Sequence, residues 1–323
     1  MNNKLNQQVV TFSLPESLAN LRLDQALSQH FPQYSRTQIK TWLAQGDILM
    51  NGQIVAAKTK VKGGEEISFK ITPPKQLNDV AQDIPLNIVF EDDDILIIDK
   101  PVGLIVHPGA GNKDQTLLNA LLHYHAPLSH LPRAGICHRL DKDTSGLLMI
   151  AKNENAFKLL TKQLTERTLQ REYQAIVYGQ LISGGKVSAP IARHPINRKR
   201  MSVHDEGKSA ITHYRVTERF RYHTHLTIRL ETGRTHQIRV HMAHIRHPII
   251  GDPLYGGRVK LGKNMSNELI EQLRTFKRQA LHAYALQFIH PSTSETIRVT
   301  SNLPDDMTAL LFALRHDKEH MPQ

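Results

Sequence analysis

Apolar side chains near the start of the chain recur at the three- to four-residue spacing of an amphipathic helix. The first stripe consists of Leu23, Ala26, Leu27, His30 and Phe31, and the second of Ile39, Trp42 and Leu43. Ser35 followed by Gln38 has the pattern of a capping box, and Gly46 is suited to end the second helix. The pattern therefore predicts two short helices in succession.

Strand patterns follow these helices directly. Residues 48–55 place Asn51-Gly52 between apolar positions, which predicts a hairpin with a type I′ turn. Residues 66–71 predict a further strand after a glycine turn. Two helices followed by short strands indicate a small α+β module, which we expect to span residues 11–72.

A polar, proline-marked segment at residues 73–84 predicts a linker, and a larger unit is expected over residues 85–315. Its predicted strands are residues 87–90, 95–98, 147–151, 175–178, 211–216, 226–230 and 296–299. Its predicted helices are residues 115–123, 154–164 and 268–276. Because the strands do not alternate regularly with helices, we expect an α+β fold with a mixed or antiparallel sheet rather than a doubly wound one.

Length and composition limit the class of protein. With 323 residues, of which 40% are hydrophobic, the chain is long enough for one large core and a small additional domain. The single cysteine, Cys137, excludes an internal disulfide and suits a reducing compartment. No apolar run approaches the roughly 18 residues that span a bilayer, and residues 1–10 lack the apolar core of a secretory signal. We therefore expect a cytoplasmic protein without a membrane partner.

The charge is strongly positive and unevenly distributed. The formal net charge is +11 and the pI is about 9.7, which favours a polyanionic partner. Residues 77–99 hold seven acidic residues and no Lys or Arg, whereas residues 186–221 hold nine basic residues against three acidic ones. This separation favours a nucleic-acid-binding face over an ordinary solvated surface.

The segment HRLDKDTSG at residues 138–146 carries the chemistry. It places one acid, Asp141, two residues after a cation, Arg139, and a buried strand is predicted to follow at once. A carboxylate held beside a sheet with a cation nearby is a candidate nucleophile or base.

Three other interpretations of this segment need to be considered. The spacing of its acids resembles the start of a calcium loop, but Lys152 occupies the twelfth position, where a bidentate Glu is required. Asp141 or Thr144 could instead cap a turn. Alternatively, Arg139 and Asp141 could form a structural ion pair.

Two further patterns suggest cofactors but lack the rest of the required sequence. Gly109-x-Gly111 has Asp114 where a dinucleotide loop needs its third glycine, so we expect no nucleotide cofactor. The histidines at 236, 241, 244 and 247 are dense, yet no H-E-x-x-H is present and no cysteine lies near them. We therefore expect no metal site.

The segment at residues 138–146 resembles the H-R-L-D-x-x-T-S-G motif of the RluA-type pseudouridine synthases, which modify ribosomal RNA. Matches to the family's other motifs lie at residues 99–103 and 107–109, 171–173, 232–242 and 247–256. One departure is Asp99, where the family usually has Asn. The resemblance implies isomerisation of uridine to pseudouridine, a reaction that needs no cofactor.

The resemblance also implies roles for individual residues. Asp141 would be the catalytic nucleophile or base, and Arg239 would pair with it and keep it ionised. Tyr173 would stack on the uracil and help to remove its C5 proton. Arg139 would fill the space that a flipped-out base vacates. Whether Asp141 attacks C1′ or removes the 2′ proton stays open.

The N-terminal module resembles the S4-type RNA-binding domain. Arg36 and Lys40 are four residues apart and share one face of the second predicted helix, and Arg22 could join them. The resemblance implies that these three residues bind RNA, although a solvated basic helix face is the alternative.

Taken together, the chain is identified as a member of this family and is most similar to those members that modify uridines in the helix 69 stem-loop of 23S ribosomal RNA. The expected partner is 23S ribosomal RNA or a precursor of the large ribosomal subunit, and the protein is expected to be a monomer. Two other functions stay open. One is a non-catalytic S4-type RNA-binding assembly factor, and the other is a nuclease or glycosidase with paired carboxylates, although no second acid lies in a comparable motif.

Overall fold

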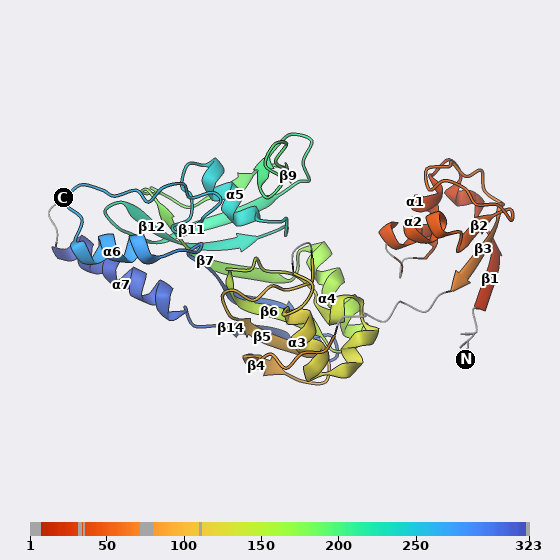
Figure 1. Ribbon diagram of the computed structural model, residues 1–323, viewed down its shortest axis with the longest axis horizontal. Helices are drawn as coiled ribbons and strands as arrows, with labels where there is room; N and C mark the ends of the chain where they lie inside the picture. Colours follow the sequence, from red (N-terminus) through yellow and green to blue (C-terminus); the bar gives the residue numbers. More distant parts are fainter. Residues whose placement is uncertain (1–7, 32–33, 35, 72–79, 110–111, 321–323) are drawn as a thin grey trace. The chain divides into compact units, whose positions relative to one another are not determined.

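The computed structural model describes residues 8–31, 34, 36–71, 80–109 and 112–320. The chain forms two compact units, Met1–Gln76 and Leu77–Gln323, which are described one at a time (Figure 1). Of the linker expected at residues 73–84, residues 73–79 lie outside the described residues, as does Ser35 of the expected capping box. None of the helices in the described ranges has the length and apolar character that crossing a membrane requires.

The N-terminal unit combines two helices with a three-stranded antiparallel sheet of order β1-β3-β2. Its elements are β1 (Gln8–Ser13), α1 (Leu23–His30), α2 (Arg36–Gln45), β2 (Ile48–Met50) and β3 (Glu66–Ile71). Both helices lie where the apolar stripes predict them. Leu23 and Leu27 of α1, Trp42 of α2 and Phe69 of β3 share one buried cluster, so the stripes face the sheet. Strand β1 was not expected and begins before residue 11.

The hairpin expected at residues 48–55 is only partly correct. Asn51 and Gly52 have positive φ angles of 51° and 75°, as a type I′ turn requires. One bridge follows the turn, after which the chain leaves the sheet, and β2 pairs with β3 instead. Ile54 is 68% exposed and Val55 is only partly buried, whereas β3 contributes the fully buried Phe69 to the core.

The larger unit is built on a nine-stranded mixed sheet. The strand order is β4-β5-β6-β13-β7-β12-β11-β8, and β14 pairs with β13. The strands are β4 (Ile88–Glu91), β5 (Ile95–Lys100), β6 (Ser145–Ala151), β7 (Gln170–Tyr178), β8 (Gly185–Ser188), β11 (Ile211–Arg219), β12 (His223–Leu230), β13 (Leu281–Ile289) and β14 (Thr296–Thr300). β6 and β13 pair in parallel, and the other neighbours pair antiparallel. The expected α+β class with a mixed sheet is confirmed.

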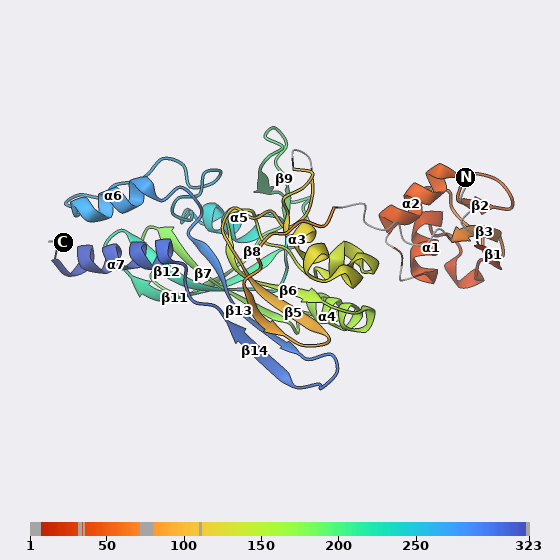
Figure 2. The same cartoon turned by 60° about the horizontal axis from the view of Figure 1, so that its bottom comes forward.

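The helices of the larger unit cover this sheet, and a two-stranded hairpin extends from it (Figures 1 and 2). The helices are α3 (Leu117–Tyr124), α4 (Glu154–Glu166), α5 (Gln237–His244), α6 (Asn267–Thr275) and α7 (Asp305–His320). The hairpin consists of β9 (Ile191–Arg193) and β10 (Met201–Val203). The described part of this unit also contains the short 3-10 segments Ala126–His130 and Pro132–Gly135, and a further one, Glu16–Leu18, lies in the N-terminal unit. The helices expected at residues 115–123, 154–164 and 268–276 correspond to α3, α4 and α6.

Strands β5 and β6 are buried on both faces. Ile97 and Met149 belong to one apolar cluster with Leu160 of α4. Ile98 belongs to a second cluster with Leu121 of α3. Every residue of β6 is buried, which explains why the segment after the HRLD motif is apolar throughout instead of alternating.

The two halves of the sheet meet where β6 and β13 run in parallel. Ser145 pairs with His282, and Gly146 pairs with Ala283. Gly146 has a φ of 109°, and a Cβ at this position would lie 2.3 Å from the backbone oxygen of Ala283. Glycine is therefore required at this crossing. The crossing lies directly after the loop that carries Asp141.

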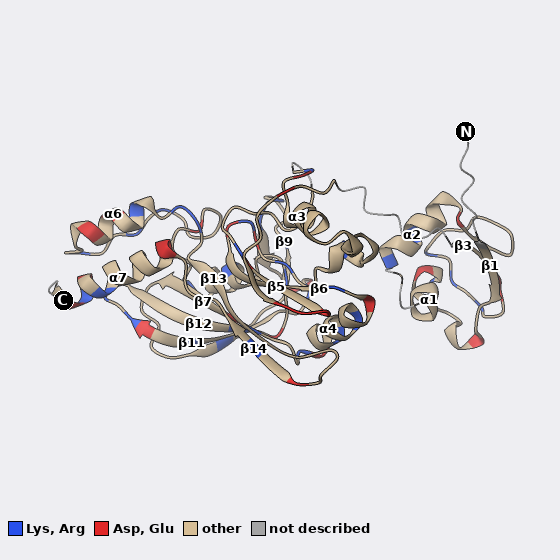
Figure 3. Cartoon of the chain, turned by 90° about the horizontal axis from the view of Figure 1, so that it is seen from below, with Lys and Arg blue, Asp and Glu red and all other residues tan. Residues whose placement is uncertain are grey.

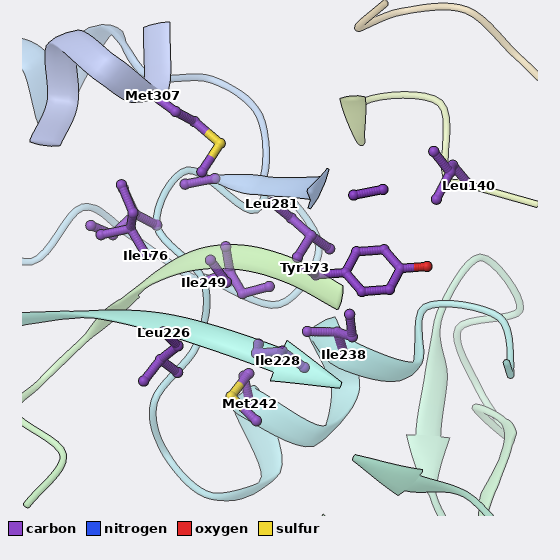
Figure 4. Packing of buried hydrophobic residues seen from close by; sticks show 14 of the residues in the cluster. Leu140, Tyr173, Ile176, Leu226, Ile228, Ile238, Met242, Ile249, Leu281 and Met307 are labelled. Atoms are coloured by element: carbon purple, nitrogen blue, oxygen red, sulfur yellow. The ribbon is translucent and has the colours of Figure 1, made fainter. Parts of the chain in front are cut away.

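The half of the sheet around β7 and β12 has its own apolar packing. Ile176 of β7 and Ile228 of β12 share a cluster with Met242 of α5 and Met307 of α7 (Figure 4). Tyr173 lies at the edge of this group, and its hydroxyl points away from Ile176, Ile228 and Met242, toward the side on which Leu140 lies (Figure 4). The apolar face of β7 therefore ends at Tyr173, whose hydroxyl is the polar group at the border of the core.

Six elements of this unit lie where the sequence predicts no helix or strand: the short strands β8, β9 and β10, and the longer β13, α5 and α7. The last three are informative. Strand β13 is buried on both sides, so its residues show no alternation. Helix α7 carries the unbroken apolar run Leu310–Leu314 and exposes Phe312, which obscures its stripe. Helix α5 contains Arg239 and His241 among its buried residues, so a purely apolar pattern could not reveal it.

We predict that acid weakens the larger unit through its buried histidines. Burial lowers the pKa of His223 and that of His225 to about 4, so both are neutral in the folded protein at pH 7. In the unfolded chain they gain protons as the pH falls below 6.5. The free energy of unfolding should therefore fall with decreasing pH from 6.5 to 4, by up to ~1.4 kcal/mol per pH unit for each group.

Urea unfolding followed by far-UV circular dichroism at pH 7, 6 and 5 measures this effect. His225→Leu should reduce the pH dependence, whereas His320→Leu at an exposed position should leave it unchanged. An undiminished pH dependence in His225→Leu would show that protonation of this side chain is not the cause.

Candidate active site

A cleft of about 490 Å³ opens in the larger unit above the centre of the sheet. The loop that precedes β6, the first residues of β7 and the segment that leads into α5 form its walls. Asp141, Tyr173, Arg239 and Arg139, which were predicted from widely separated motifs, all line it. The fold therefore brings the four residues predicted for the larger unit into one site.

Asp141 and Arg239 form an ion pair at the base of the cleft. Nη1 of Arg239 donates a hydrogen bond of 2.9 Å to Oδ2 of Asp141. The Arg239 side chain is 5% exposed, whereas that of Asp141 is 18% exposed. The cation is thus buried behind the carboxylate, and the carboxylate is the member of the pair that a substrate can reach.

A second carboxylate, that of Asp252, fixes the same guanidinium from behind. Nε and Nη2 of Arg239 donate to the two oxygens of Asp252 at 2.7 and 2.9 Å. The Asp252 side chain is fully buried, and its Oδ1 also accepts the backbone N–H groups of Leu254 and Tyr255. Burial alone would lower the pKa of Arg239, but the hydrogen bonds and charges of Asp252 and Asp141 raise it above the ordinary arginine value. Arg239 therefore stays charged and has one orientation.

Tyr255 and His236 complete this side of the cleft. The Arg239 guanidinium lies 5.1 Å from the centre of the Tyr255 ring. The Tyr255 hydroxyl accepts the backbone N–H of Met201 at 2.8 Å and lies 2.9 Å from Nδ1 of His236. Nε2 of His236 is 3.9 Å from Oδ1 of Asp141. Because burial lowers the pKa of His236, its ring adds no full charge beside Asp141 at pH 7.

A buried lysine holds the loop that carries Asp141. Lys100 is fully buried, and its ammonium group donates to the backbone oxygens of Pro101, Leu104 and Lys142 at 2.8, 3.0 and 2.9 Å. Burial lowers the pKa of Lys100 to about 8. The residue after Asp141 is thus anchored to the end of β5, which restricts where the carboxylate can lie.

Tyr173 projects from β7 into the cleft and is 5% exposed. Its ring belongs to the apolar cluster, together with Leu140 and Ile238 on either side of the cleft. Burial and the nearby Asp141 carboxylate raise the pKa of its hydroxyl, although Arg171 opposes this shift. At neutral pH the tyrosine therefore presents a flat ring and a protonated hydroxyl.

The other interpretations of the HRLD segment find no support in the contacts of the described residues. Arg139 is exposed, and the ion-pair partner of Asp141 is Arg239. The Asp141 side chain accepts its hydrogen bond from Arg239 rather than from a turn amide; it is the backbone oxygen of Asp141 that accepts Thr144 N–H.

Asp99, which departs from the family motif, accepts a hydrogen bond from Ser301.

The dense histidines near α5 have separate partners. His241 contacts the Thr212 hydroxyl and the Ala189 carbonyl oxygen, and His247 contacts the Tyr178 carbonyl oxygen. Within the described ranges, no three His, Cys, Asp or Glu side chains gather in a way that could hold a metal ion.

In the N-terminal unit, Arg22, Arg36 and Lys40 converge on Asp24. The Asp24 side chain is fully buried, and its oxygens lie 3.0, 2.9 and 3.5 Å from the three cations. In Figure 3 an acidic position is coloured on α1 and a basic one on α2, and Nε of Arg36 on α2 donates a hydrogen bond to Asp24 on α1. Burial alone would raise the pKa of Asp24, but hydrogen bonds from Arg36 and Arg22 outweigh it and lower the pKa. The basic face exists as expected, but its three side chains are held together by a carboxylate that sequence reasoning missed.

Comparison with known proteins gives the family. Residues 94–244 match the family model described as RNA pseudouridylate synthase, and residues 21–67 match the S4 domain. Proteins named ribosomal large subunit pseudouridine synthase D are similar over nearly the whole chain. The one from Xanthomonas campestris is 50% identical over 98% of this chain and 95% of its own length. The chain belongs to the RNA pseudouridylate synthase family.

Two further proteins of that printed name extend the comparison. The one from Salmonella typhimurium is 52% identical and the one from Escherichia coli K12 is 50% identical, each over 96% of this chain and 95% of its own length. The fold agrees with two solved human structures. RNA pseudouridylate synthase domain containing 4 has a TM-score of 0.56 at 24% identity, over 71% of this chain and 93% of its own. RNA pseudouridylate synthase domain containing 1 has a TM-score of 0.52 at 24% identity, over 76% and 100%. The chain is therefore an RNA pseudouridine synthase with an N-terminal S4 domain.

Several residues of the site were missed by sequence reasoning. Asp252 lies within a matched family segment, but nothing in its neighbours along the chain indicates a contact with Arg239. Lys100 follows an apolar strand, where a buried ammonium group is unexpected. Arg171 precedes the predicted Tyr173 by two residues and so shares its face of β7. That spacing was a usable signal, and it places Arg171 in the cleft.

We predict that Asp24→Asn destabilises the S4 unit, because it removes the carboxylate that offsets three neighbouring cations. The loss should be about 1–2 kcal/mol at pH 7, less than for a fully buried pair since the cations are partly solvated. The folded-state pKa of Asp24 is lowered, so the carboxylate contributes above pH 3.8 and its contribution is lost as the pH falls through the folded-state pKa. The difference between variant and wild type should therefore shrink in acid.

Trp42, the single tryptophan of the chain, lies in this unit, so its fluorescence reports S4 unfolding in the full-length protein. Asp47→Asn is the control, because Asp47 forms no ion pair with a described residue. Equal unfolding midpoints for the Asp24 and Asp47 variants would mean that Asp24 does not stabilise the cluster.

Proposed function

We propose that this synthase isomerises specific uridines to pseudouridine in large-subunit ribosomal RNA, with Asp141 as the reacting carboxylate. The observation that carries this assignment is the reachable Asp141 carboxylate, which Arg239 holds in the cleft that Tyr173 also lines. An aligned carboxylate, a buried cation and an aromatic platform are the groups that the reaction uses.

The reaction rearranges bonds within one nucleotide. The N1–C1′ bond breaks, the uracil turns, a C5–C1′ bond forms, and the C5 proton leaves while N1 gains a proton. Asp141 would either attack C1′ or remove the 2′ proton. Tyr173 would stack on the uracil and assist the final removal of the C5 proton, which its hydroxyl position at the edge of the apolar cluster allows. The reaction is an isomerisation: bonds and protons change position within the nucleotide, and no redox step is needed.

The target base has to leave its stack to reach Asp141. Arg139 is exposed at the mouth of the cleft, two residues from Asp141. We assign it the role of occupying the space that the flipped nucleotide leaves. Because Arg139 lies on the same loop as Asp141, which Lys100 anchors, the two side chains would keep a fixed separation when the nucleotide enters the cleft.

The names of the full-length relatives support large-subunit ribosomal RNA as the substrate, and the +11 net charge suits a polyanion. We propose 23S ribosomal RNA, in its helix 69 stem-loop, as the target, either free or within a large-subunit precursor. Arg22, Arg36 and Lys40 would hold a flanking stem, because their combined charge exceeds that of Asp24 by two. We also propose that the protein acts in the cytoplasm and as a monomer.

The alternative of a non-catalytic assembly factor predicts RNA binding without turnover. The intact arrangement of Asp141, Arg239 and Asp252 argues against this alternative. RNA binding alone needs cations, whereas a carboxylate that is held in place and accessible to substrate is needed for chemistry.

Release of tritium from C5-labelled uridine in a helix 69 stem-loop tests the proposed function. The wild-type enzyme should release tritium without cleaving the strand, whereas Asp141→Asn should fall below about one thousandth of the wild-type rate. RNA affinity should stay within a few-fold, because binding rests on many phosphate contacts. Asp143→Asn makes the same change two residues away and should keep most activity. If Asp141→Asn kept a tenth of the wild-type rate, Asp141 would be neither nucleophile nor base; if the wild type released none, the assembly-factor alternative would gain.

A further inference from the structure

Arg171 is a buried cation that has no partner among the residues that the structure describes. It lies on β7, is 8% exposed and lines the cleft. Its Nε is inaccessible to solvent and has no hydrogen-bond partner, and the guanidinium forms no ion pair with any residue in the described ranges. An unpaired buried charge is costly, since the protein interior does not replace the lost hydration. Such a group points to a ligand that supplies the missing acceptor.

Three other arginines of the cleft already have acceptors, whereas Arg133 and Arg139 are exposed and can be hydrated. Arg239 binds Asp141 and Asp252, and Arg167 binds Glu231 at 2.7 Å. Arg234 donates to the backbone oxygen of Ser209. Arg171 thus differs from these neighbours in having its hydrogen-bonding capacity unused.

The chain leaves room for this guanidinium at Gly233. A Cβ at residue 233 would lie 2.7 Å from Nη1 of Arg171, closer than real side-chain contacts allow. The absence of a side chain at this point of the cleft wall therefore lets the Arg171 guanidinium lie against the backbone of the turn that leads to α5.

His138 presents a second unused donor in the same cleft. Its Nε2 accepts the backbone N–H of Met149 at 3.2 Å, so the neutral ring carries its proton on Nδ1. Burial, and secondly the charge of Arg171, lower the pKa of His138 to about 3, which keeps the ring neutral. Nδ1 is buried and has no partner among the described residues. The N–H donor of His138 and the guanidinium of Arg171 therefore both lack an acceptor.

The position of Arg171 relative to Tyr173 indicates which part of the substrate it meets. Both residues lie on the same face of β7, two positions apart, and so are separated by roughly 6.6 Å along the strand. All three of Arg171, Tyr173 and Asp141 line the same cleft, so a uridine between Asp141 and Tyr173 would bring its own backbone near Arg171. An uncharged uracil carbonyl would leave the cation unneutralised once the substrate excludes water, whereas a phosphate neutralises it and matches the planar donor fork.

We propose that Arg171, assisted by the Nδ1–H of His138, binds a phosphate group that flanks the target uridine. This subsite rests on the proposed reaction, since it assumes a uridine between Asp141 and Tyr173. It anchors the backbone of the flipped nucleotide inside the cleft, separately from the contacts that the S4 unit makes.

Neutral linkages in the RNA test the subsite directly. A helix 69 stem-loop is prepared with a single methylphosphonate either 5′ or 3′ of the target uridine, and binding is measured by fluorescence anisotropy separately from tritium release. For the wild-type enzyme, one of the two linkages should weaken binding about tenfold to a hundredfold, as expected for a lost charge-assisted contact. If neither linkage weakens wild-type binding, the proposal is wrong, whatever the variants do.

Arg171→Gln completes the comparison, because it removes the charge and keeps a side chain of similar length. It should weaken binding of the unmodified RNA by a similar factor. Its affinity should then be the same for the unmodified RNA and for the RNA with the neutral linkage that weakens wild-type binding. Arg171→Lys should recover part of the affinity and part of the sensitivity. Arg167→Gln, which changes a cleft arginine paired with Glu231, should stay as sensitive as the wild type. If the Arg171→Gln substitution and the neutral linkage each reduced RNA affinity by its full factor when combined, the two changes would act on different contacts and the proposal would be wrong. Because binding is measured apart from turnover, a failure of isomerisation would count against the proposed function without deciding this test.

Discussion

The site depends on one guanidinium held between two carboxylates. Asp252 takes two of the donor groups of Arg239, and the remaining Nη1 is directed at Asp141. Asp252 is fully buried and accepts two backbone N–H groups, so its position is fixed. Asp252 in turn fixes Arg239, and Arg239 fixes Asp141. Removal of either carboxylate would leave a buried charge less well compensated, which is why such a set stays together once formed. The outcome is a carboxylate that is reachable by substrate and yet has little freedom to move.

The fold assembles this triad from segments that are distant along the chain. Asp141 lies on the loop before β6, and Arg239 lies on α5, while the parallel crossing of β6 and β13 joins the two halves of the sheet beneath them. Lys100 anchors the Asp141 loop through three backbone oxygens. Asp24 has a comparable role in the S4 unit, where it gathers three cations into one cluster. In both units a buried charge positions the groups that are proposed to meet RNA.

The sequence predicts those features that depend on neighbouring residues. The helical stripes locate α1, α2, α3 and α4, and the apolar run after the HRLD segment locates β6. The motifs also predict that Asp141, Tyr173 and Arg239 come together. Strand β13 and helix α7 escape prediction because burial on both sides, or an unbroken apolar run, removes the periodicity on which such predictions rest. Asp252, Lys100 and Asp24 escape for another reason: each acts through contacts that only the folded chain creates.

The single-turnover rate of Asp252→Asn tests the central claim most directly. The amide keeps the shape of Asp252 but removes its charge and one acceptor, so Arg239 should no longer align Asp141. At saturating enzyme, the rate of isomerisation should fall about 100-fold, the typical consequence of a small misplacement of a reacting group. Asp317→Asn is the matched control, because Asp317 is equally buried and paired with Arg221 but does not line the cleft. It should lose stability and keep its rate, with folding of both variants checked at the assay temperature. A folded Asp252→Asn enzyme that isomerises at the wild-type rate would contradict the claim that Asp252 positions Asp141 through Arg239.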